Sequence, residues 1–352
     1  MPRLLIAASG TGGHIYPALS LAESISNSWE IVWLGVPNRL EIELVPKKYQ
    51  LITLQVGGLQ GSIFRKLVEF FKLLFASIQV AILLRQKKIN VIFTTGGYIS
   101  APSILGAKLT GTPILLHESN AIPGKVTRLL GRFCDHLALG IPTTADYLAG
   151  CKTSFTGTPV RSEFFLDQPL PSWVPKGEGV LIVVMGGSQG AKKLNGMVRS
   201  LLPWLLEKGC RIVHLTGKND CFYRNLGNIK AHTNFVFRNF SDEMPALLSN
   251  ADLAISRAGA GAICELIITK TPSVLIPFPQ SADQHQELNA AYMAQLGGAV
   301  IVHQHNPEEH ILRNTISNLL DSNSLAEMKF NMNKNNFLKP EEKIIEIIKS
   351  IS

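Results

Sequence analysis

The chain has 352 residues, which is enough for two domains of ordinary size with separate hydrophobic cores. Hydrophobic residues make up 46% of it and charged residues 17%, so the composition excludes an intrinsically disordered protein. The formal net charge of +8 fits nucleic acid, anionic lipid or phosphorylated small molecules as partners. The chain lacks zinc-finger spacing and basic runs interleaved with aromatic residues, so we expect no nucleic acid.

Cysteine usage and the first residues indicate a protein that is not exported. The five cysteines are scattered and form no C-x-x-C pair, as expected of reduced thiols in a cytosol. The apolar run from Leu4 to Ala8 is too short for the core of a signal peptide. We therefore expect a cytosolic location.

The first half of the chain alternates short apolar runs with helical patterns. Strands are predicted at residues 4–8, 31–34, 91–94, 114–116 and 136–139. Helices are predicted at residues 17–26, 63–85, 101–109 and 125–131. Continuous Val, Ile and Leu runs are typical of strands buried on both faces, so this order predicts a doubly wound parallel sheet.

A glycine-rich loop, Gly10-Thr11-Gly12-Gly13-His14, follows the first predicted strand. Such a turn into a helix presents free backbone N–H groups to an anion. The loop does not match the dinucleotide fingerprint G-x-G-x-x-G, because Ile15 occupies the last position. Gly217-Lys218 is followed by Asn219, so no phosphate-binding P-loop is present either. NAD binding and ATP hydrolysis are therefore disfavoured.

The predicted helix at residues 63–85 is mostly apolar but interrupted by charges. A helix that spans a membrane needs about 20 nearly uncharged residues, so this segment is not one. It can be a core helix of the first half, or a helix whose apolar and basic surface rests on an anionic membrane. Both interpretations can hold for one long helix.

The second half repeats the pattern of the first. Residues 165–179 contain prolines and glycines without periodicity and are predicted to link domains at residues 1–164 and 180–338. Strands are predicted at residues 180–185, 212–215, 234–237, 253–256, 273–277 and 299–302. Helices are predicted at residues 191–207, 243–249, 260–268, 283–296 and 307–320. The last segment, residues 339–352, is predicted to form an amphipathic helix that can pack back on the first domain.

A second glycine loop, Gly186-Gly187-Ser188-Gln189-Gly190-Ala191, also follows an apolar strand, and we interpret it as a diphosphate cradle. Two such openings half a chain apart predict two similar α/β halves that face one another. The chain has no Asp-x-Asp pair to hold a divalent cation, so we expect no metal site. Helix ends, backbone N–H groups and Arg or Lys would then neutralise the phosphates.

Two later stretches carry hydrogen-bonding or small residues after a strand. The run from Arg257 to Ala262 starts a helix that carries Glu265, an arrangement suited to a diphosphate and a ribose diol. Ordinary helix packing would use the same small residues. Residues 277–289 are rich in amide and acid side chains, which suit sugar hydroxyls or a surface helix capped by Asp283.

Taken together, the motifs resemble the GT-B glycosyltransferases of family 28 that act in peptidoglycan synthesis. The resemblance covers nearly the whole chain. Besides the two glycine loops and residues 257–265 and 283–289, it rests on Asn38-Arg39-Leu40-Glu41, Leu44-Val45-Pro46-Lys47, Gly96-Gly97-Tyr98, His117-Glu118-Ser119-Asn120, Gly157-Thr158-Pro159-Val160-Arg161 and Asp242-Glu243-Met244. It implies an α/β fold of two facing Rossmann-like, doubly wound parallel-sheet domains. It also implies transfer of N-acetylglucosamine from UDP-GlcNAc to undecaprenyl-pyrophosphoryl-MurNAc-pentapeptide, which converts lipid I to lipid II.

The resemblance also implies which residues contact the donor, with no cofactor. Thr11, Gly12, Gly13 and Asn120 would approach the sugar, and Arg161 and Ser188 the diphosphate. The backbone near Ser241 would read the uracil, and Gln286 would meet the sugar hydroxyls. The residues expected to line the phosphate and ribose are Ala260, Gly261, Ala262, Ile263, Cys264 and Glu265.

The implied reaction is an inverting displacement by the muramoyl 4-hydroxyl, which needs a base and a stabilised leaving diphosphate. His14 is the candidate base, because a helix N-terminus disfavours the imidazolium form and leaves a neutral imidazole. Alternatively, His14 only hydrogen-bonds a phosphate or the sugar. Glu118 and Glu41 are the fallback bases or acceptor contacts.

An acceptor with a long prenyl chain stays in the membrane. We therefore expect peripheral binding to the cytoplasmic face of the bacterial inner membrane, through Phe70, Phe71 and Leu74. Three alternatives remain open from the sequence. They are a related lipid glycosyltransferase that makes glycosyl-diacylglycerol, a UDP-sugar 2-epimerase on the same architecture, and a nucleotide-sugar-binding module without activity.

Overall fold

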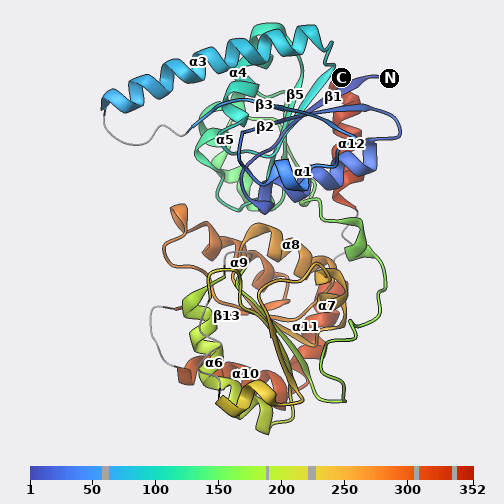
Figure 1. The fold of residues 1–352 in the computed structure, drawn as a ribbon, viewed down its shortest axis with the longest axis vertical. Coiled ribbons are helices and arrows are strands. Elements are labelled where there is room, and N and C mark those ends of the chain that lie inside the picture. Colours follow the sequence, from blue (N-terminus) through green and yellow to red (C-terminus); the bar gives the residue numbers. More distant parts are fainter. Residues whose placement is uncertain (58–62, 188–189, 221–226, 305–308, 335–338) are drawn as a thin grey trace. The chain divides into compact units, whose positions relative to one another are not determined.

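The computed structural model describes residues 1–57, 63–187, 190–220, 227–304, 309–334 and 339–352. The chain divides into two compact units, which we call the first and the second unit (Figure 1). The first comprises Met1–Arg161 and Phe337–Ser352, and the second Ser162–Asn336. The segment predicted as a linker, residues 165–179, groups with the second unit. Trp173 of this segment donates a hydrogen bond of 2.6 Å from Nε1 to Glu243 Oε2 of the second unit.

The first unit is built on a parallel sheet in the order β3-β2-β1-β4-β5-β6-β7. Its strands are β1 (Arg3–Ala7), β2 (Glu30–Gly35), β3 (Gln50–Thr53), β4 (Val91–Thr94), β5 (Ile114–Glu118), β6 (His136–Leu139) and β7 (Thr153–Phe155). Its longer helices are α1 (Gly12–Ile25), α3 (Ile63–Gln86), α4 (Ser100–Thr110), α5 (Lys125–Leu130) and α12 (Pro340–Ile351), with the short α2 at Glu41–Leu44. Every neighbouring pair of strands is parallel, which confirms the predicted doubly wound sheet.

Both faces of this sheet are covered, because successive strand residues point to opposite sides. Leu4 and Ile6 of β1 join a core with α1 and α12. Leu5 and Ala7 join the opposite core with α3 and α4. The continuous apolar runs seen in the sequence are therefore explained by burial on both faces.

Helices α3 and α4 pack closely. A Cβ atom at Gly106 of α4 would lie 2.8 Å from Val80 Cγ1 of α3, so glycine permits this approach. Figure 1 shows the amino-terminal half of α3 projecting beyond α4 and the sheet.

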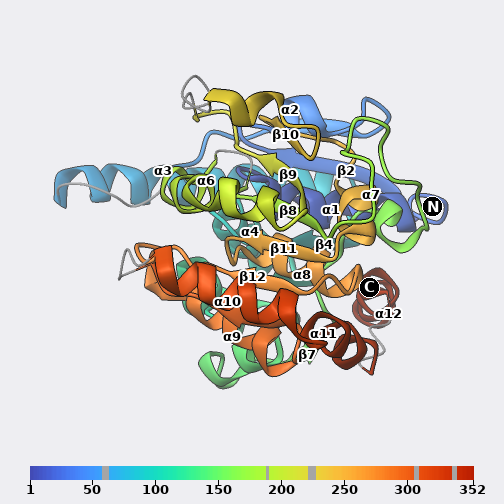
Figure 2. The ribbon, with the colours of Figure 1, turned by 90° about the horizontal axis from the view of Figure 1, so that it is seen from below.

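The second unit repeats the architecture with the strand order β10-β9-β8-β11-β12-β13, most of which can be followed in Figure 2. Its strands are β8 (Leu181–Met185), β9 (Arg211–Leu215), β10 (Phe235–Arg238), β11 (Leu253–Ser256), β12 (Ser273–Leu275) and β13 (Ala299–Ile301). Its helices are α6 (Lys192–Glu207), α7 (Met244–Asn250), α8 (Ala260–Ile268), α9 (His285–Gln295), α10 (Glu309–Asp321) and α11 (Ser324–Asn333). The α9 helix begins after Asp283 and Gln284, which both have left-handed φ angles, so Asp283 is not its N-cap.

Each sheet has a point at which the strand order reverses. In the first unit it lies between β1 and β4, and in the second between β8 and β11. Ligands of open α/β sheets bind at the carboxyl ends of the strands at such a point. The two glycine loops follow β1 and β8, so both stand where this rule places a ligand.

Candidate active site

In the first unit, His14 lies in the first turn of α1 and faces the loop after β4. Its Nδ1 atom is 2.6 Å from the carbonyl oxygen of Thr95, and Thr95 Oγ1 donates a bond of 2.9 Å to the His14 carbonyl. A carbonyl oxygen only accepts, so Nδ1 carries the proton of the neutral imidazole and Nε2 presents a lone pair. A Cβ atom at Gly97 would lie 3.7 Å from Nε2, so this glycine keeps the surroundings of Nε2 open.

Glu41, one of the fallback bases, is fully buried. Its Oε1 accepts the N–H of Val36 at 2.7 Å, and its Oε2 accepts the N–H of Gly10 at 3.3 Å. The carboxylate therefore holds the first glycine loop, and its burial leaves it no route to a substrate hydroxyl.

Glu118, at the carboxyl end of β5, is also buried. Its Oε1 accepts the backbone and side-chain N–H groups of Asn120, each at 3.2 Å. Its Oε2 accepts Gly124 N at 2.9 Å and Thr127 Oγ1 at 2.8 Å. Both oxygens are thus engaged in fixing the loop that leads into α5, and Glu118 orients Asn120, a predicted sugar contact.

The neighbouring His117 is a structural residue. It is fully buried and stacked on Phe93, with ring centroids 6.5 Å apart. Burial lowers the pKa of His117 to about 4, so the ring is neutral at physiological pH.

The other predicted donor contacts of the first unit surround the start of α1. Thr11 and Gly13 are exposed and Gly12 is half-buried. The Arg161 guanidinium lies 5.5 Å from the ring of Tyr16, one turn into α1. The structure therefore brings Arg161 to the same helix end as His14.

In the second unit, the glycine loop after β8 leads into α6. Gly187 and Gly190 have φ angles of +82° and +81°, which favour glycine. Lys192 and Lys193 lie in the first turn of α6, where no acidic residue balances them. Positive charge and unpaired N–H groups at a helix start favour an anion. Ser188, predicted to contact the diphosphate, lies outside the described residues.

The start of α8 follows β11 through Gly259. A Cβ atom at Gly259 or Gly261 would meet nothing within 4 Å, so there is room beside this helix end. Gly261, Ala262 and Glu265 are half-buried and reach the surface. The side chains of Ala260, Ile263 and Cys264 are buried, so any contact these three residues make with a ligand would come from the backbone.

Arg257 places a buried positive charge behind this helix start. It donates hydrogen bonds of 2.9 Å to the Ile276 carbonyl, 3.1 Å to the Pro277 carbonyl and 2.5 Å to Gln304 Oε1, all neutral acceptors. Burial lowers the pKa of Arg257 to about 10, so the guanidinium stays charged at pH 7. The positive potential at this edge of the sheet favours a diphosphate.

Ser241 and Gln286 use part of their polar groups within the protein. Ser241 Oγ accepts the N–H of Glu243 at 3.1 Å. Gln286 Oε1 accepts the N–H of Phe278 at 2.9 Å. The carbonyl end of the Gln286 amide is thereby fixed, and its NH₂ group is the end that can donate to a sugar hydroxyl.

Sequence reasoning missed three polar residues that support these loops. Thr95 fixes the ring of His14, and the buried residues Asn195 and Asp220 join α6 to the loop after β9. Asn195 carried one signal, a buried amide among the apolar positions of an amphipathic helix. The partners of all three residues are distant in sequence, so their roles needed the fold.

The described residues contain no group of three or more His, Cys, Asp or Glu side chains arranged to hold a metal ion. Over the same part of the chain, no helix is long and apolar enough to cross a membrane. On α3, apolar side chains are nevertheless exposed along one side, at spacings of three or four residues. They are Val68, Phe71, Phe75, Ile78 and Ile82, flanked by Phe70 and Leu74.

Known proteins match the chain along its whole length. Residues 4–139 match the N-terminal domain of glycosyltransferase family 28, and residues 181–348 match its C-terminal domain. A protein of Prochlorococcus marinus (strain NATL1A) is 77% identical over 100% of both chains. It is named UDP-N-acetylglucosamine–N-acetylmuramyl-(pentapeptide) pyrophosphoryl-undecaprenol N-acetylglucosamine transferase. A protein of the same name from Synechococcus sp. (strain WH7803) is 60% identical over 91% of this chain and 88% of its own.

The crystal structure of MurG from Acinetobacter baumannii has the same fold. It superposes with a TM-score of 0.80 at 25% identity and covers 99% of this chain and 100% of its own. This match confirms the predicted GT-B fold of two Rossmann-like domains. With a family model matched in each unit and relatives of high identity, the chain belongs to glycosyltransferase family 28.

Proposed function

We propose that this protein transfers N-acetylglucosamine from UDP-GlcNAc to the 4-hydroxyl of undecaprenyl-pyrophosphoryl-MurNAc-pentapeptide with inversion, and so converts lipid I to lipid II. The observation that carries the proposal is the full-length 77% identity to a transferase named for these substrates. The arrangement around His14 adds a base suited to the chemistry.

In the proposed reaction, the muramoyl O4 attacks the anomeric carbon of GlcNAc. The bond from that carbon to the β-phosphate oxygen breaks, and its electron pair leaves with UDP. His14 Nε2 accepts the proton of the attacking hydroxyl, while the bond from Nδ1 to the Thr95 carbonyl keeps the ring in the required tautomer. Asn120, oriented by Glu118, contacts the donor sugar.

Charge builds up on the departing diphosphate, so positive potential at that point lowers the barrier. The start of α6 with Lys192 and Lys193, the start of α8, and the buried Arg257 provide it in the second unit. Arg161 provides it in the first unit. The roles of Gln286 toward the sugar hydroxyls and of the Ser241 backbone toward the uracil belong to the same proposal.

The test is transfer of radiolabelled GlcNAc from UDP-GlcNAc to a lipid I analogue. We expect one labelled product of increased size, with UDP released in equal amount. Label on diacylglycerol would instead support the glycosyl-diacylglycerol alternative, and formation of UDP-ManNAc the epimerase alternative. Donor binding without any product would leave a binding module and contradict the proposal.

The acceptor is anchored by a prenyl chain, so the protein works at the cytoplasmic face of the membrane. The exposed side of α3 is the surface that binds an anionic bilayer, through Phe70, Phe71 and Leu74 together with Phe75 and Ile78. Arg85 and Lys88, exposed at the carboxyl end of α3 and just beyond it, add electrostatic attraction. We expect the protein to bind no nucleic acid.

A further inference from the structure

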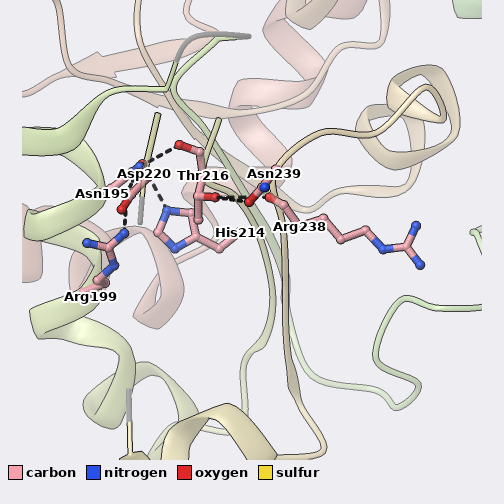
Figure 3. A network of polar contacts seen from close by, with 7 residues as sticks. All are labelled: Asn195, Arg199, His214, Thr216, Asp220, Arg238 and Asn239. Atoms are coloured by element: carbon pink, nitrogen blue, oxygen red, sulfur yellow. Dashed lines mark hydrogen bonds and ion pairs between the residues drawn. The ribbon is translucent and has the colours of Figure 1, made fainter. Parts of the chain in front are cut away.

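A cluster of polar side chains is buried at the carboxyl end of β9, against the first turns of α6 (Figure 3). At its centre, Asn195 of α6 donates hydrogen bonds of 2.8 Å to the Thr216 carbonyl and 2.5 Å to Asp220 Oδ2. Arg199, one turn further along α6, forms an ion pair with the same Asp220 oxygen. One amide and one carboxylate thus join α6 to the loop that follows β9.

His214 of β9 completes the cluster, with Nε2 at 3.1 Å from Asn195 Oδ1. Both hydrogens of the Asn195 amide point to oxygen acceptors, so Oδ1 must accept and His214 Nε2 must carry the proton. Burial lowers the pKa of His214 to about 4, which keeps the ring neutral. Every hydrogen-bonding atom of the Asn195 side chain is therefore used, and no other residue type offers this set of donors and acceptor in the same shape.

The cluster adjoins the phosphate side of the proposed donor site. Asn195 lies in the first turn of α6, directly after the glycine loop. Gly190 of that loop rests on the Thr216 carbonyl so closely that a side chain there would collide with the oxygen. The Thr216 carbonyl, which accepts a hydrogen bond from Asn195, therefore also packs directly against the glycine loop.

The same loop after β9 extends to the uracil side. Thr216 Oγ1 donates to Asn239 Oδ1 at 3.3 Å, and Gly217 N donates to the Asn239 carbonyl at 3.0 Å. Asn239 stands two residues before Ser241, whose backbone is the proposed uracil contact. One connected set of hydrogen bonds thus runs from the first turn of α6, which follows the diphosphate loop, to Asn239, two residues before Ser241.

We infer that Asn195, with Asp220 and His214, is a positioning residue of the donor site, which holds the diphosphate loop and the uracil loop at the spacing that UDP requires. The inference rests on the proposed function, since that function makes these loops the nucleotide site. Its consequence is specific: a substitution in the cluster lowers the affinity for UDP and UDP-GlcNAc, whereas the affinity for the acceptor stays unchanged.

The decisive variant is Asn195→Asp, which keeps the shape but sets two carboxylates against each other. We expect the Kd for UDP, measured by calorimetry on the full-length protein, and the KM for UDP-GlcNAc to rise about tenfold or more, because buried groups lose their partners. The KM for a lipid I analogue should stay unchanged. The double variant Asn195→Asp/Asp220→Asn restores a donor opposite an acceptor and should recover part of the UDP affinity.

Thr271→Val is the matched control. Thr271 is buried in the same unit just before β12, at the opposite edge of the parallel sheet from the carboxyl end of β8, and its hydroxyl donates a bond of 2.8 Å to the Leu248 carbonyl. Its loss should lower the melting temperature while UDP affinity stays at the wild-type value. If Asn195→Asp does not fold, Asp220→Asn alone replaces it, with a smaller expected loss of UDP affinity.

Wild-type UDP affinity in these cluster variants would overturn the inference, as would an equal loss of UDP affinity in Thr271→Val. UDP binding needs no acceptor, so failure of the proposed function can be told apart. A wild-type protein that binds UDP but transfers nothing to lipid I refutes that function, while the UDP affinities of the variants still decide the positioning role.

Discussion

The hydrogen bond between His14 and the Thr95 carbonyl leads to a kinetic prediction for a single residue. His14→Ala should lower kcat by about 10²- to 10⁴-fold, the usual contribution of a general base, with little change in UDP affinity. Steady-state kinetics with a lipid I analogue and calorimetry with UDP check this, since loss of the base should lower kcat and spare donor binding.

Glu118→Gln is the companion variant for His14→Ala. Both carboxylate oxygens of Glu118 accept hydrogen bonds from the loop before α5, so this variant should weaken donor binding through Asn120 and change kcat far less than His14→Ala does. Near-normal turnover in His14→Ala, together with a large loss of kcat in Glu118→Gln, would contradict the assignment of the base.

Glu341, at the start of α12, is a buried acid that links stability to pH. Its Oε1 lies 2.5 Å from Ser20 Oγ, which is also 2.6 Å from the Val160 carbonyl. Ser20 has one hydrogen and cannot donate to both oxygens at once, whereas a protonated Glu341 can donate to Ser20 Oγ while Ser20 donates to the Val160 carbonyl. Burial, the largest effect, raises the pKa of Glu341 above its ordinary value of 4.5, and the hydrogen bond that the ionised carboxylate accepts from Ser20 opposes this.

A raised pKa makes the neutral form the stabilising one. Its contribution is fully present below the unfolded pKa of 4.5 and is lost as pH rises through the folded value. Glu341→Gln keeps a neutral donor at every pH, so it should melt at a higher temperature than wild type at pH 7 to 8, and the difference should shrink below pH 5. Melting curves across this pH range test the prediction, and a constant difference would contradict it.

At the scale of the element, α3 shows how a helix can serve a core and a surface together. Its buried residues Ala76, Val80 and Leu84 face the sheet and α4, while Phe71 and Phe75 are among the most exposed apolar side chains. Phe71→Ser/Phe75→Ser should therefore abolish most binding to vesicles that contain anionic lipid and leave the melting temperature unchanged. Flotation of the protein with such vesicles is the measurement.

Phe330→Ser is the control for the vesicle experiment, because Phe330 of α11 in the second unit is 61% exposed, as Phe71 is at 60%. This variant should float with the vesicles as wild type does. Equal loss in both variants would show that exposed phenylalanine in general, and not the α3 surface, is responsible. Unchanged flotation of the α3 variant would contradict the membrane proposal.

The elements themselves could largely be predicted from the sequence. Strands buried on both faces, such as β1 and β8, leave a continuous apolar signal. The strands β3 and β7 at the sheet edges were missed, since they are only four and three residues long and no more than partly buried. The sequence predicts the start of α1 at Pro17, a common first helical residue, but the helix begins at Gly12 with Pro17 inside it.

The parts of the candidate site that depend on local sequence could be predicted. Glycine loops after strands indicated where an anion would bind, and residues such as His14 followed from their place in those loops. The supporting groups were not predictable, because Thr95, Asn195 and the carboxylate of Glu118 acquire their roles from partners brought together by the fold. Both carboxylate oxygens of Glu118, a predicted fallback base, accept hydrogen bonds in the folded protein.

At the scale of the whole molecule, the first unit is not continuous in sequence, because it contains both the beginning and the end of the chain. Helix α12 is the last element in the sequence, yet Ile344 and Ile348 are fully buried in the core of the first unit, with Ile15 and Leu19 of α1. The first unit is therefore completed only when the end of the chain is in place. A defect in α12 should weaken the first unit and leave the core of the second intact.

Ile344→Ala tests this dependence. Truncation of a fully buried isoleucine costs about 2 to 5 kcal/mol, because the lost methyl groups leave a cavity. Hydrogen exchange should become faster in β1 and α1 and stay unchanged in β8 and β11. Ile311→Ala on α10, where the side chain is 41% exposed, provides the matched truncation and should alter neither unit. Faster exchange in both units after Ile344→Ala would show that they unfold together, and α12 would then stabilise the whole chain rather than the first unit alone.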